Sequence, residues 1–152
     1  MSTSPTLPVR VVVFASEQLF PALQFLLHCA SHYGSRLHSI HIYCTDDERR
    51  SGKPARRLKE AMETWGKQNN QCFNVDITQG DMWPNAVRQG LLNWFEAYAD
   101  CHWLVNVTGG TKPMSAAAIE LTLSTDLSSS SLSGFRPLNF FPYFAMKNIA
   151  AC

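Results

Sequence analysis

The chain has 152 residues, of which 45% are hydrophobic and 16% charged, and its formal net charge is +1. A chain of this length is expected to form a single domain, 1–152, with a sizeable buried core. The near-neutral charge excludes a polycation that binds nucleic acid or membranes through its overall field, so any affinity for phosphates has to be local.

The periodicity of apolar residues predicts four strands that alternate with four helices. Residues 9–15 form a valine-rich apolar run, which is typical of a parallel strand buried on both faces. In chain order, we expect strand 9–15, helix 20–32, strand 37–44, helix 54–67, strand 73–78, helix 84–99, strand 103–107 and helix 114–123. The charged segment 45–53 between the second strand and the second helix is predicted to be a polar loop.

Strands that alternate with helices predict an α/β fold, a three-layer, Rossmann-like open and mostly parallel sheet with helices on both faces. The expected strand order is 3-2-1-4, with room for further strands. In that order the chain reverses its direction across the sheet between the first and fourth strands, and the crevice at such a point is the general ligand site of open α/β folds. Its walls are expected to be the loops Ser16-Glu17-Gln18 and Thr108 to Met114.

The C-terminal part has a different composition from the core, 9–123. Residues 124–134 are rich in serine, which predicts a flexible loop. The aromatic segment 135–144 contains Pro137 and Pro142, which argue against a central strand. This segment is expected to add an edge strand or to cover an interface.

The strongest functional signal is the segment from Asn106 to Ser115. An apolar strand runs directly into Gly109 and Gly110, and a helix follows at once. Glycines let the backbone approach a ligand closely, and a helix start offers unpaired N–H groups to an anion, to which Lys112 adds a cation. The spacing differs from that of the Walker A loop. The pattern therefore predicts an anion site of another kind than that of the NTPases.

Other signals in the sequence have simpler interpretations. The five cysteines are widely spaced without a Cys-x-x-Cys pair, which favours neither a disulfide framework nor a zinc site, and no metal or cofactor is expected. We interpret the basic residues of 49–57 as a solvated loop and helix start, because acidic residues adjoin them. We interpret Trp83, Trp94 and Trp103 as core residues and not as platforms for base stacking. No apolar run reaches the length of a membrane span and residues 1–8 do not resemble a signal peptide, so no membrane contact and a cytoplasmic location are expected.

The turn Asn106-x-Thr108-Gly109-Gly110-Thr111-Lys112-x-Met114 resembles the signature of the CRISPR-associated Rossmann-fold (CARF) domains. The loop Ser16-Glu17-Gln18, followed by Pro21, is similar to the N-terminal ligand loop of the subgroup that is fused to restriction-like nucleases. The resemblance covers about 9–123. It implies binding of a cyclic oligoadenylate, most often cyclic tetra-adenylate, across the two-fold axis of a homodimer, as a sensor or sink in type III CRISPR antiviral defence.

The resemblance also implies roles for single residues. The implied ligand-binding residues are Ser16, Glu17, Gln18, Thr108, Gly109, Gly110, Thr111, Lys112 and Met114. Some members of the family cleave the ring without a metal through attack of a ribose 2′-hydroxyl group on the neighbouring phosphate. Lys112 would then be the catalytic residue that stabilises the developing charge, although the motif contains no clear general base.

Three functions remain open from the sequence. The first is a sensor or sink for a cyclic oligoadenylate, and the second is a metal-independent ring nuclease that degrades the same ligand. The third is an unrelated Rossmann-like domain that binds a nucleotide. No duplex DNA binding is expected from this domain alone.

Overall fold

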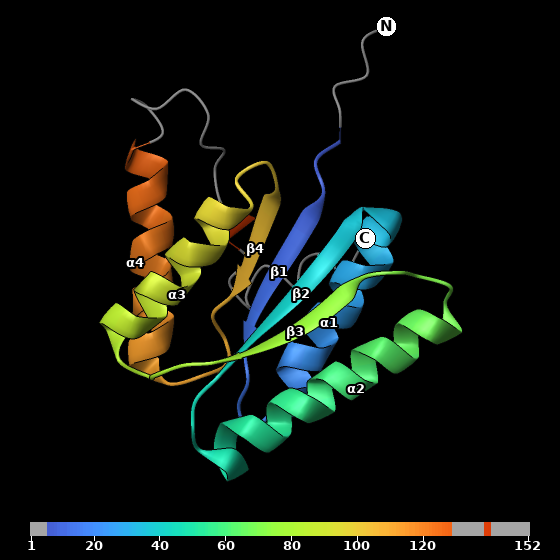
Figure 1. Cartoon of the computed structure of the whole chain (residues 1–152), viewed down its shortest axis with the longest axis horizontal. Helices are drawn as coiled ribbons and strands as arrows, with labels where there is room; N and C mark the ends of the chain where they lie inside the picture. The colour runs from blue at the N-terminus through green and yellow to red at the C-terminus, as the bar shows by residue number, and fades with distance from the viewer. Residues whose placement is uncertain (1–5, 129–138, 141–152) are drawn as a thin grey trace, which may run out of the picture.

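The computed structural model describes residues 6–128 and 139–140, which form a sheet with helices on both faces (Figure 1). The strands are β1 (Val9–Phe14), β2 (Leu37–Cys44), β3 (Asn74–Gln79), β4 (His102–Asn106) and β5 (Asn139–Phe140). The helices are α1 (Leu19–Tyr33), α2 (Lys53–Gln68), α3 (Pro84–Ala97) and α4 (Lys112–Ser128), with the short turns η1 (Gly34–Arg36) and η2 (Glu48–Gly52).

The strand order is β3-β2-β1-β4-β5, and every neighbouring pair is parallel. This confirms the predicted order 3-2-1-4 and the Rossmann-like fold. In the register, Val12 of β1 lies opposite His41 of β2 and Val105 of β4. The carboxyl ends of β2, β1 and β4 therefore share one edge of the sheet, and the loops that follow them meet there.

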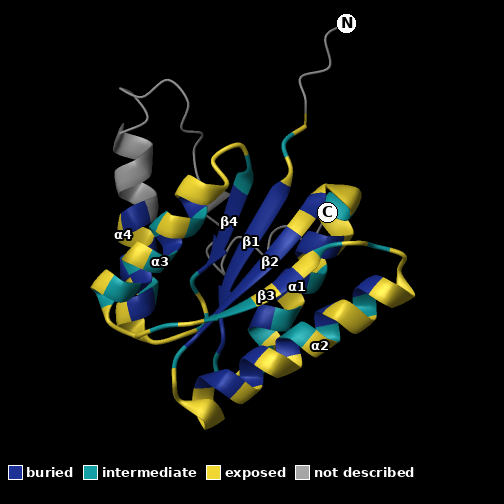
Figure 2. Ribbon diagram, viewed as in Figure 1, coloured by how far each residue is buried: buried dark blue, intermediate teal, exposed yellow. Residues whose placement is uncertain are grey.

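The core has two layers because β1 is buried on both faces, as its continuous apolar run predicts. Val11 and Val13 pack under α1 and α2, whereas Val12 and Phe14 pack under α3 and α4. Figure 2 shows the central strands buried along their length, with the exposed residues on the outer faces of the helices. Full burial of one such side chain stabilises the fold by about 1.5–3 kcal/mol.

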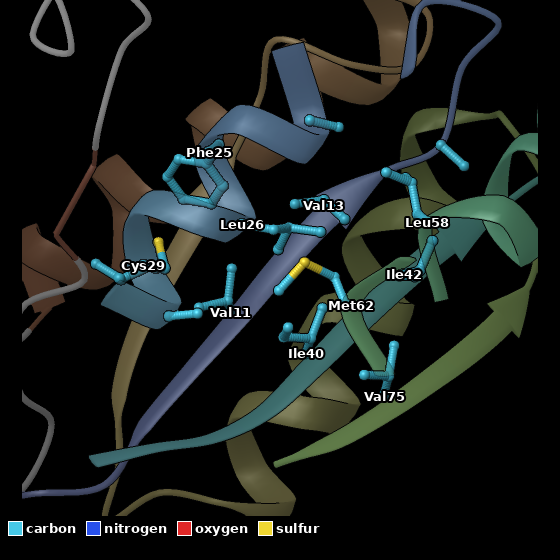
Figure 3. Packing of buried hydrophobic residues seen from close by; sticks show 14 of the residues in the cluster. Val11, Val13, Phe25, Leu26, Cys29, Ile40, Ile42, Leu58, Met62 and Val75 are labelled. Atoms are coloured by element: carbon cyan, nitrogen blue, oxygen red, sulfur yellow. The ribbon is translucent and has the colours of Figure 1, made fainter. Parts of the chain in front are cut away.

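The helix α1 shows how a helix fits this sheet. Its buried residues Ala22, Phe25, Leu26 and Cys29 follow the spacing of one helical face. Figure 3 shows Phe25, Leu26 and Cys29 on α1 above the valines of β1, with Met62 of α2 beside them. This packing holds the amino end of α1 at the carboxyl end of β1, where the loop Ser16-Glu17-Gln18 lies.

Three sequence predictions need correction. Segment 45–53 is not a simple loop, because it contains the helical turn η2, in which the Asp47 carboxylate accepts a hydrogen bond of 2.9 Å from the Arg50 N–H group. The helix α4 begins at Lys112 and continues to Ser128, so the first residues of the serine-rich stretch are helical. Trp83 is 62% exposed and is not a core residue.

The remaining predictions for the C-terminal part hold where the structure describes it. Residues 139–140 pair with β4 at the edge of the sheet, which agrees with an edge strand. The rest of the predicted loop and aromatic segment, at 129–138 and 141–144, lies outside the described residues. Within 6–128 and 139–140, no helix is long and apolar enough to cross a membrane.

Candidate functional site

The turn after β4 is held in shape by its own side chains. Asn106 is buried, and its side-chain oxygen accepts hydrogen bonds from the Thr108 N–H group at 2.8 Å and from the Thr108 hydroxyl group at 2.5 Å. The Ser115 hydroxyl group donates to the carbonyl oxygen of Val107 at 2.7 Å. The Asn106 bonds thus brace the start of the turn, and the Ser115 bond ties that start to the first turn of α4.

The two glycines let this turn lie directly against the end of β1. A Cβ atom at Gly109 would collide with the carbonyl oxygen of Phe14, which belongs to the backbone and cannot yield. A Cβ atom at Gly110 would lie 2.9 Å from the Cβ atom of Phe14, and Gly110 has a φ of +81°, which side chains rarely adopt. The glycines thus serve the close contact between the β4 turn and the β1 end.

The first turn of α4 faces the same edge of the sheet. Lys112 is the first residue of the helix and is exposed, and Pro113 lacks only an N–H group that would have no partner inside the helix. The N–H groups of Lys112 and Met114 cannot be satisfied within the helix, because they belong to its first turn. This end of α4 therefore carries a partial positive charge that suits an anion.

The loop after β1 forms the opposite wall. The Ser16 hydroxyl group lies 3.4 Å from the carbonyl oxygen of Gln18, and the Leu19 N–H group donates to the Glu17 carbonyl oxygen at 3.1 Å. The Glu17 carboxylate pairs with Arg49 at 3.4 Å, but both side chains are exposed and such a pair contributes little to stability. Glu17 is thus available to a ligand at small cost.

A third wall, which the sequence reasoning missed, comes from the segment after β2. The buried Ser51 hydroxyl group donates to the carbonyl oxygen of Ala15 at 3.2 Å and accepts from the Thr45 N–H group at 2.9 Å. It thereby ties the β2 segment to the end of β1. Strand order alone could have indicated this wall, because β2 neighbours β1 and their carboxyl ends share one edge.

These three segments, together with Met82, enclose a pocket of about 520 Å³ at the carboxyl ends of the strands, a size typical of small-ligand sites. Its lining residues are Ala15, Ser16, Glu17, Gln18, Thr45, Asp46, Asp47, Arg50, Ser51, Met82, Thr108, Gly110, Thr111 and Met114. The pocket thus brings together all the predicted binding residues except Gly109 and Lys112. Gly109 packs against Phe14, and Lys112 stands next to the lining residue Thr111.

The basic residues of 49–57 are exposed, which agrees with the predicted solvated loop and helix start. One of them, Arg50, also lines the pocket, which was not predicted. Met82, from the segment between β3 and α3, also lines the pocket. The neighbouring residue Asp81 is held in place by Tyr43 of β2, whose hydroxyl group donates to the Asp81 carbonyl oxygen at 2.6 Å.

The ionisable groups of the strand ends restrict the chemistry of the site. Burial raises the pKa of the Cys44 thiol, so Cys44 remains protonated and is a poor nucleophile. Burial, and then the charge of Asp81, raises the pKa of Tyr43, whose hydroxyl group remains a hydrogen-bond donor. Among the described residues, no group of His, Cys, Asp and Glu side chains could hold a metal ion.

The fold and the pocket define an open α/β domain with a pocket at the point where the strand order reverses, which is the usual place of a ligand site in such folds. The sequence model of the family described as the Card1 CARF domain matches residues 10–127. The chain therefore belongs to the CARF domains, which sense cyclic oligoadenylates in CRISPR defence. This membership excludes the unrelated Rossmann-like domain among the three functions considered. The chain has no match among the curated proteins.

Proposed function

We propose that this chain binds a cyclic oligoadenylate, and cyclic tetra-adenylate in particular, as a sensor or sink in type III CRISPR antiviral defence. The observation that carries the proposal is the convergence of two predicted loops. Ser16-Glu17-Gln18 and the turn from Thr108 to Met114 lie far apart in the sequence, yet both line one pocket of a CARF domain.

The amino end of α4 is the place that suits a phosphate of the ring. Gly110 brings the backbone close to the ligand, the Thr111 hydroxyl group can donate a hydrogen bond, and the first N–H groups of the helix are free of intrahelical partners. Lys112 is exposed beside them and can add a charge-assisted hydrogen bond. In a ring nuclease, the same lysine would stabilise the charge that develops on the phosphate.

A homodimer would suit both the ligand and the pocket. A cyclic tetra-adenylate is larger than the ligands that a pocket of about 520 Å³ ordinarily encloses. Two copies of the pocket around a two-fold axis would supply the same contacts twice to a symmetric ring. We therefore propose one ring for two chains.

The finer affiliation is also a proposal. The loop Ser16-Glu17-Gln18 and Pro21 favour the subgroup that is fused to restriction-like nucleases. We propose that residues 1–152 form a single CARF-like domain whose core is 9–123.

The proposed function is tested by calorimetric titration of the chain with cyclic tri-, tetra- and hexa-adenylate. We expect heat with the tetra-adenylate ring at one ring for two chains. The recovered ligand is then chromatographed. An intact ring supports a sensor or sink, whereas linear products with a 2′,3′-cyclic phosphate identify a ring nuclease. Absence of heat with every ring would contradict the proposal.

A further inference from the structure

The pocket contains an acidic wall that an anion alone does not explain. Glu17, Asp46 and Asp47 line it, and Arg50 is the only basic residue among the lining residues. Phosphates are bound by cations and N–H groups, and carboxylates repel them. The ligand must therefore present a different chemical group to this wall.

Two of the three carboxylates already have partners within the protein. Asp47 accepts a hydrogen bond from the Arg50 N–H group at 2.9 Å and thereby caps η2. Glu17 pairs with Arg49 at 3.4 Å. Among residues 6–121, whose side chains the structure describes, none forms a hydrogen bond or ion pair with the Asp46 carboxylate. Of the three lining carboxylates, it is the one that can accept a hydrogen bond from a ligand without giving up a partner.

The position of Asp46 is fixed although its side chain is free. The preceding residue, Thr45, donates its N–H group to Ser51 at 2.9 Å, and Ser51 in turn donates to the carbonyl oxygen of Ala15 at 3.2 Å. Following Asp46, Asp47 caps η2. A carboxylate held between two anchored residues is suited to selective recognition, because little backbone freedom is lost on binding.

The sheet places Asp46 opposite the phosphate end of the pocket. Asp46 follows β2, whereas Gly110 and Thr111 follow β4, and β1 lies between these strands. A nucleotide with its phosphate at α4 therefore extends over the end of β1 toward Asp46. An ionised carboxylate can only accept hydrogen bonds, so the group that meets it must be a donor. In dinucleotide-binding α/β folds, an acidic residue takes a ribose hydroxyl group in this way.

We propose that Asp46 is a specificity-determining residue that accepts a hydrogen bond from a donor on the nucleotide, either a ribose 2′-hydroxyl group or the amino group of adenine. Both donors have the same chemistry toward a carboxylate. The inference rests on the proposed function, because it assigns a contact within the same pocket. It makes the pocket selective for nucleotides that carry this donor and not merely for phosphates.

The test compares three rings on three proteins by calorimetry. The rings are cyclic tetra-adenylate, its 2′-deoxy analogue, and the analogue in which hypoxanthine replaces adenine and the amino group is lost. The proteins are the natural chain, Asp46→Ala and the control Asp100→Ala. Asp100 is an exposed aspartate in the turn before β4, at the opposite end of that strand, and outside the pocket.

We expect Asp46→Ala to weaken binding of cyclic tetra-adenylate at least about tenfold, the usual loss for a hydrogen bond to a charged group. The analogue that lacks the recognised donor should bind the natural chain correspondingly weakly, and Asp46→Ala should bind it no worse than the natural chain does. The donor that Asp46 recognises is then the group that is missing from this weakly binding analogue. Asp100→Ala should bind all three rings as the natural chain does.

Two results would overturn the inference while the proposed function stands. If Asp46→Ala binds every ring more tightly, the carboxylate only repels the phosphates. If Asp46→Ala binds all three rings as the natural chain does, Asp46 does not contact the ligand. Failure of the natural chain to bind any ring would instead contradict the proposed function itself.

Discussion

Among the predicted binding residues, Lys112 is one whose side chain has to turn in order to contact a ligand in the pocket. It begins α4 and is exposed, but its side chain does not line the pocket. A lysine carries its charge on a long flexible stem, so an exposed lysine next to a lining residue can turn toward an anion when one is bound. Its neighbour Thr111 does line the pocket.

Substitution of Lys112 by alanine is expected to weaken binding of cyclic tetra-adenylate by about 1.5–3 kcal/mol for each lysine that contacts a phosphate, because a charge-assisted hydrogen bond is lost. Calorimetric titration measures the change. Lys67→Ala is the matched control, since Lys67 is an exposed lysine in the last turn of α2 and does not line the pocket. Equal affinities of the two folded variants would remove Lys112 from the site.

His41 shows how the same sheet buries polar residues beneath α3. It is buried, and its ring lies 5.0 Å from that of Trp94 and 5.4 Å from that of Trp103. Its Nε2 atom is 3.3 Å from Nη1 of Arg10, whose guanidinium group stacks 3.5 Å above the ring of Tyr98. Burial, and then the charge of Arg10, lowers the pKa of His41 to about 4. The imidazole is therefore neutral and accepts a hydrogen bond from Arg10.

This lowered pKa makes stability depend on pH. Between pH 6.5 and about 4 the unfolded chain binds a proton at His41 that the folded chain does not bind, so the free energy of unfolding falls as the pH falls. Through His41, the free energy of unfolding falls by about 1 kcal/mol for each pH unit below 6.5 in this window. Above the window, His41 does not make stability depend on pH. In His41→Gln the side chain can still accept from Arg10 but does not titrate. Urea unfolding at several pH values should show a shallower dependence for this variant, and parallel curves would contradict the assignment.

The turn between β4 and α4 is shaped by its contact with the end of β1. Gly110 has both a positive φ and a neighbour, since an added Cβ atom would lie 2.9 Å from the Cβ atom of Phe14. Gly34, which ends α1, has a φ of +54° but nothing within 4 Å of such an atom. Gly34 therefore serves as a comparison in which a positive φ occurs without such a contact.

Gly110→Ala is expected to destabilise the fold by about 1–2 kcal/mol from the positive φ alone, with an additional loss from the contact with Phe14. Gly34→Ala should show only the first loss. Urea unfolding of both variants measures the difference, and calorimetry should show weaker ring binding for Gly110→Ala only. Equal losses of stability and unchanged binding would mean that the turn can move away from β1 freely.

The elements that the sequence predicted are those that local patterns determine. The apolar run of β1 and the spacing of Phe25, Leu26 and Cys29 on α1 depend only on which face is buried, so both could be predicted. The turn from Thr108 to Met114 was also predictable, because glycines and a helix start lie together in the sequence. The bounds of α4 were less accurate, since the serine-rich stretch from residue 124 was predicted to be a loop although its first residues are helical.

The parts that were missed depend on neighbours in space. In the sequence, Ser51 is one polar residue of a charged segment. Its hydrogen bond to the carbonyl oxygen of Ala15 exists only because the fold brings the two residues together. Arg50 and Asp46 were not predicted to line the pocket, because their place depends on how β2 neighbours β1. Trp83 was predicted to be a core residue because it lies next to a regular element, but the turn before α3 leaves it exposed.

The charge of the chain is as informative as its fold. The formal net charge of +1 gives no general field that would attract a polyanion. The positive features in and beside the pocket are local: the amino end of α4 and Arg50 at the pocket, and Lys112 next to it. Acidic residues lie beside them on the segment after β2. Recognition of a phosphate should therefore require the pocket and not the surface.

Duplex DNA is accordingly expected to bind this chain very weakly. A protein that binds duplex DNA without sequence preference does so by neutralising many phosphates, and its affinity falls steeply with salt. In this chain only a few local positive groups are available to neutralise phosphates. The electrophoretic mobility of a DNA duplex at physiological salt should therefore stay unchanged when the chain is added at micromolar concentration. Under the same conditions the chain should bind cyclic tetra-adenylate, and Lys112→Ala should reduce the salt dependence of that binding. A duplex that is retarded, and that competes with the ring, would show that the basic residues of 49–57 act as a polyanion surface instead.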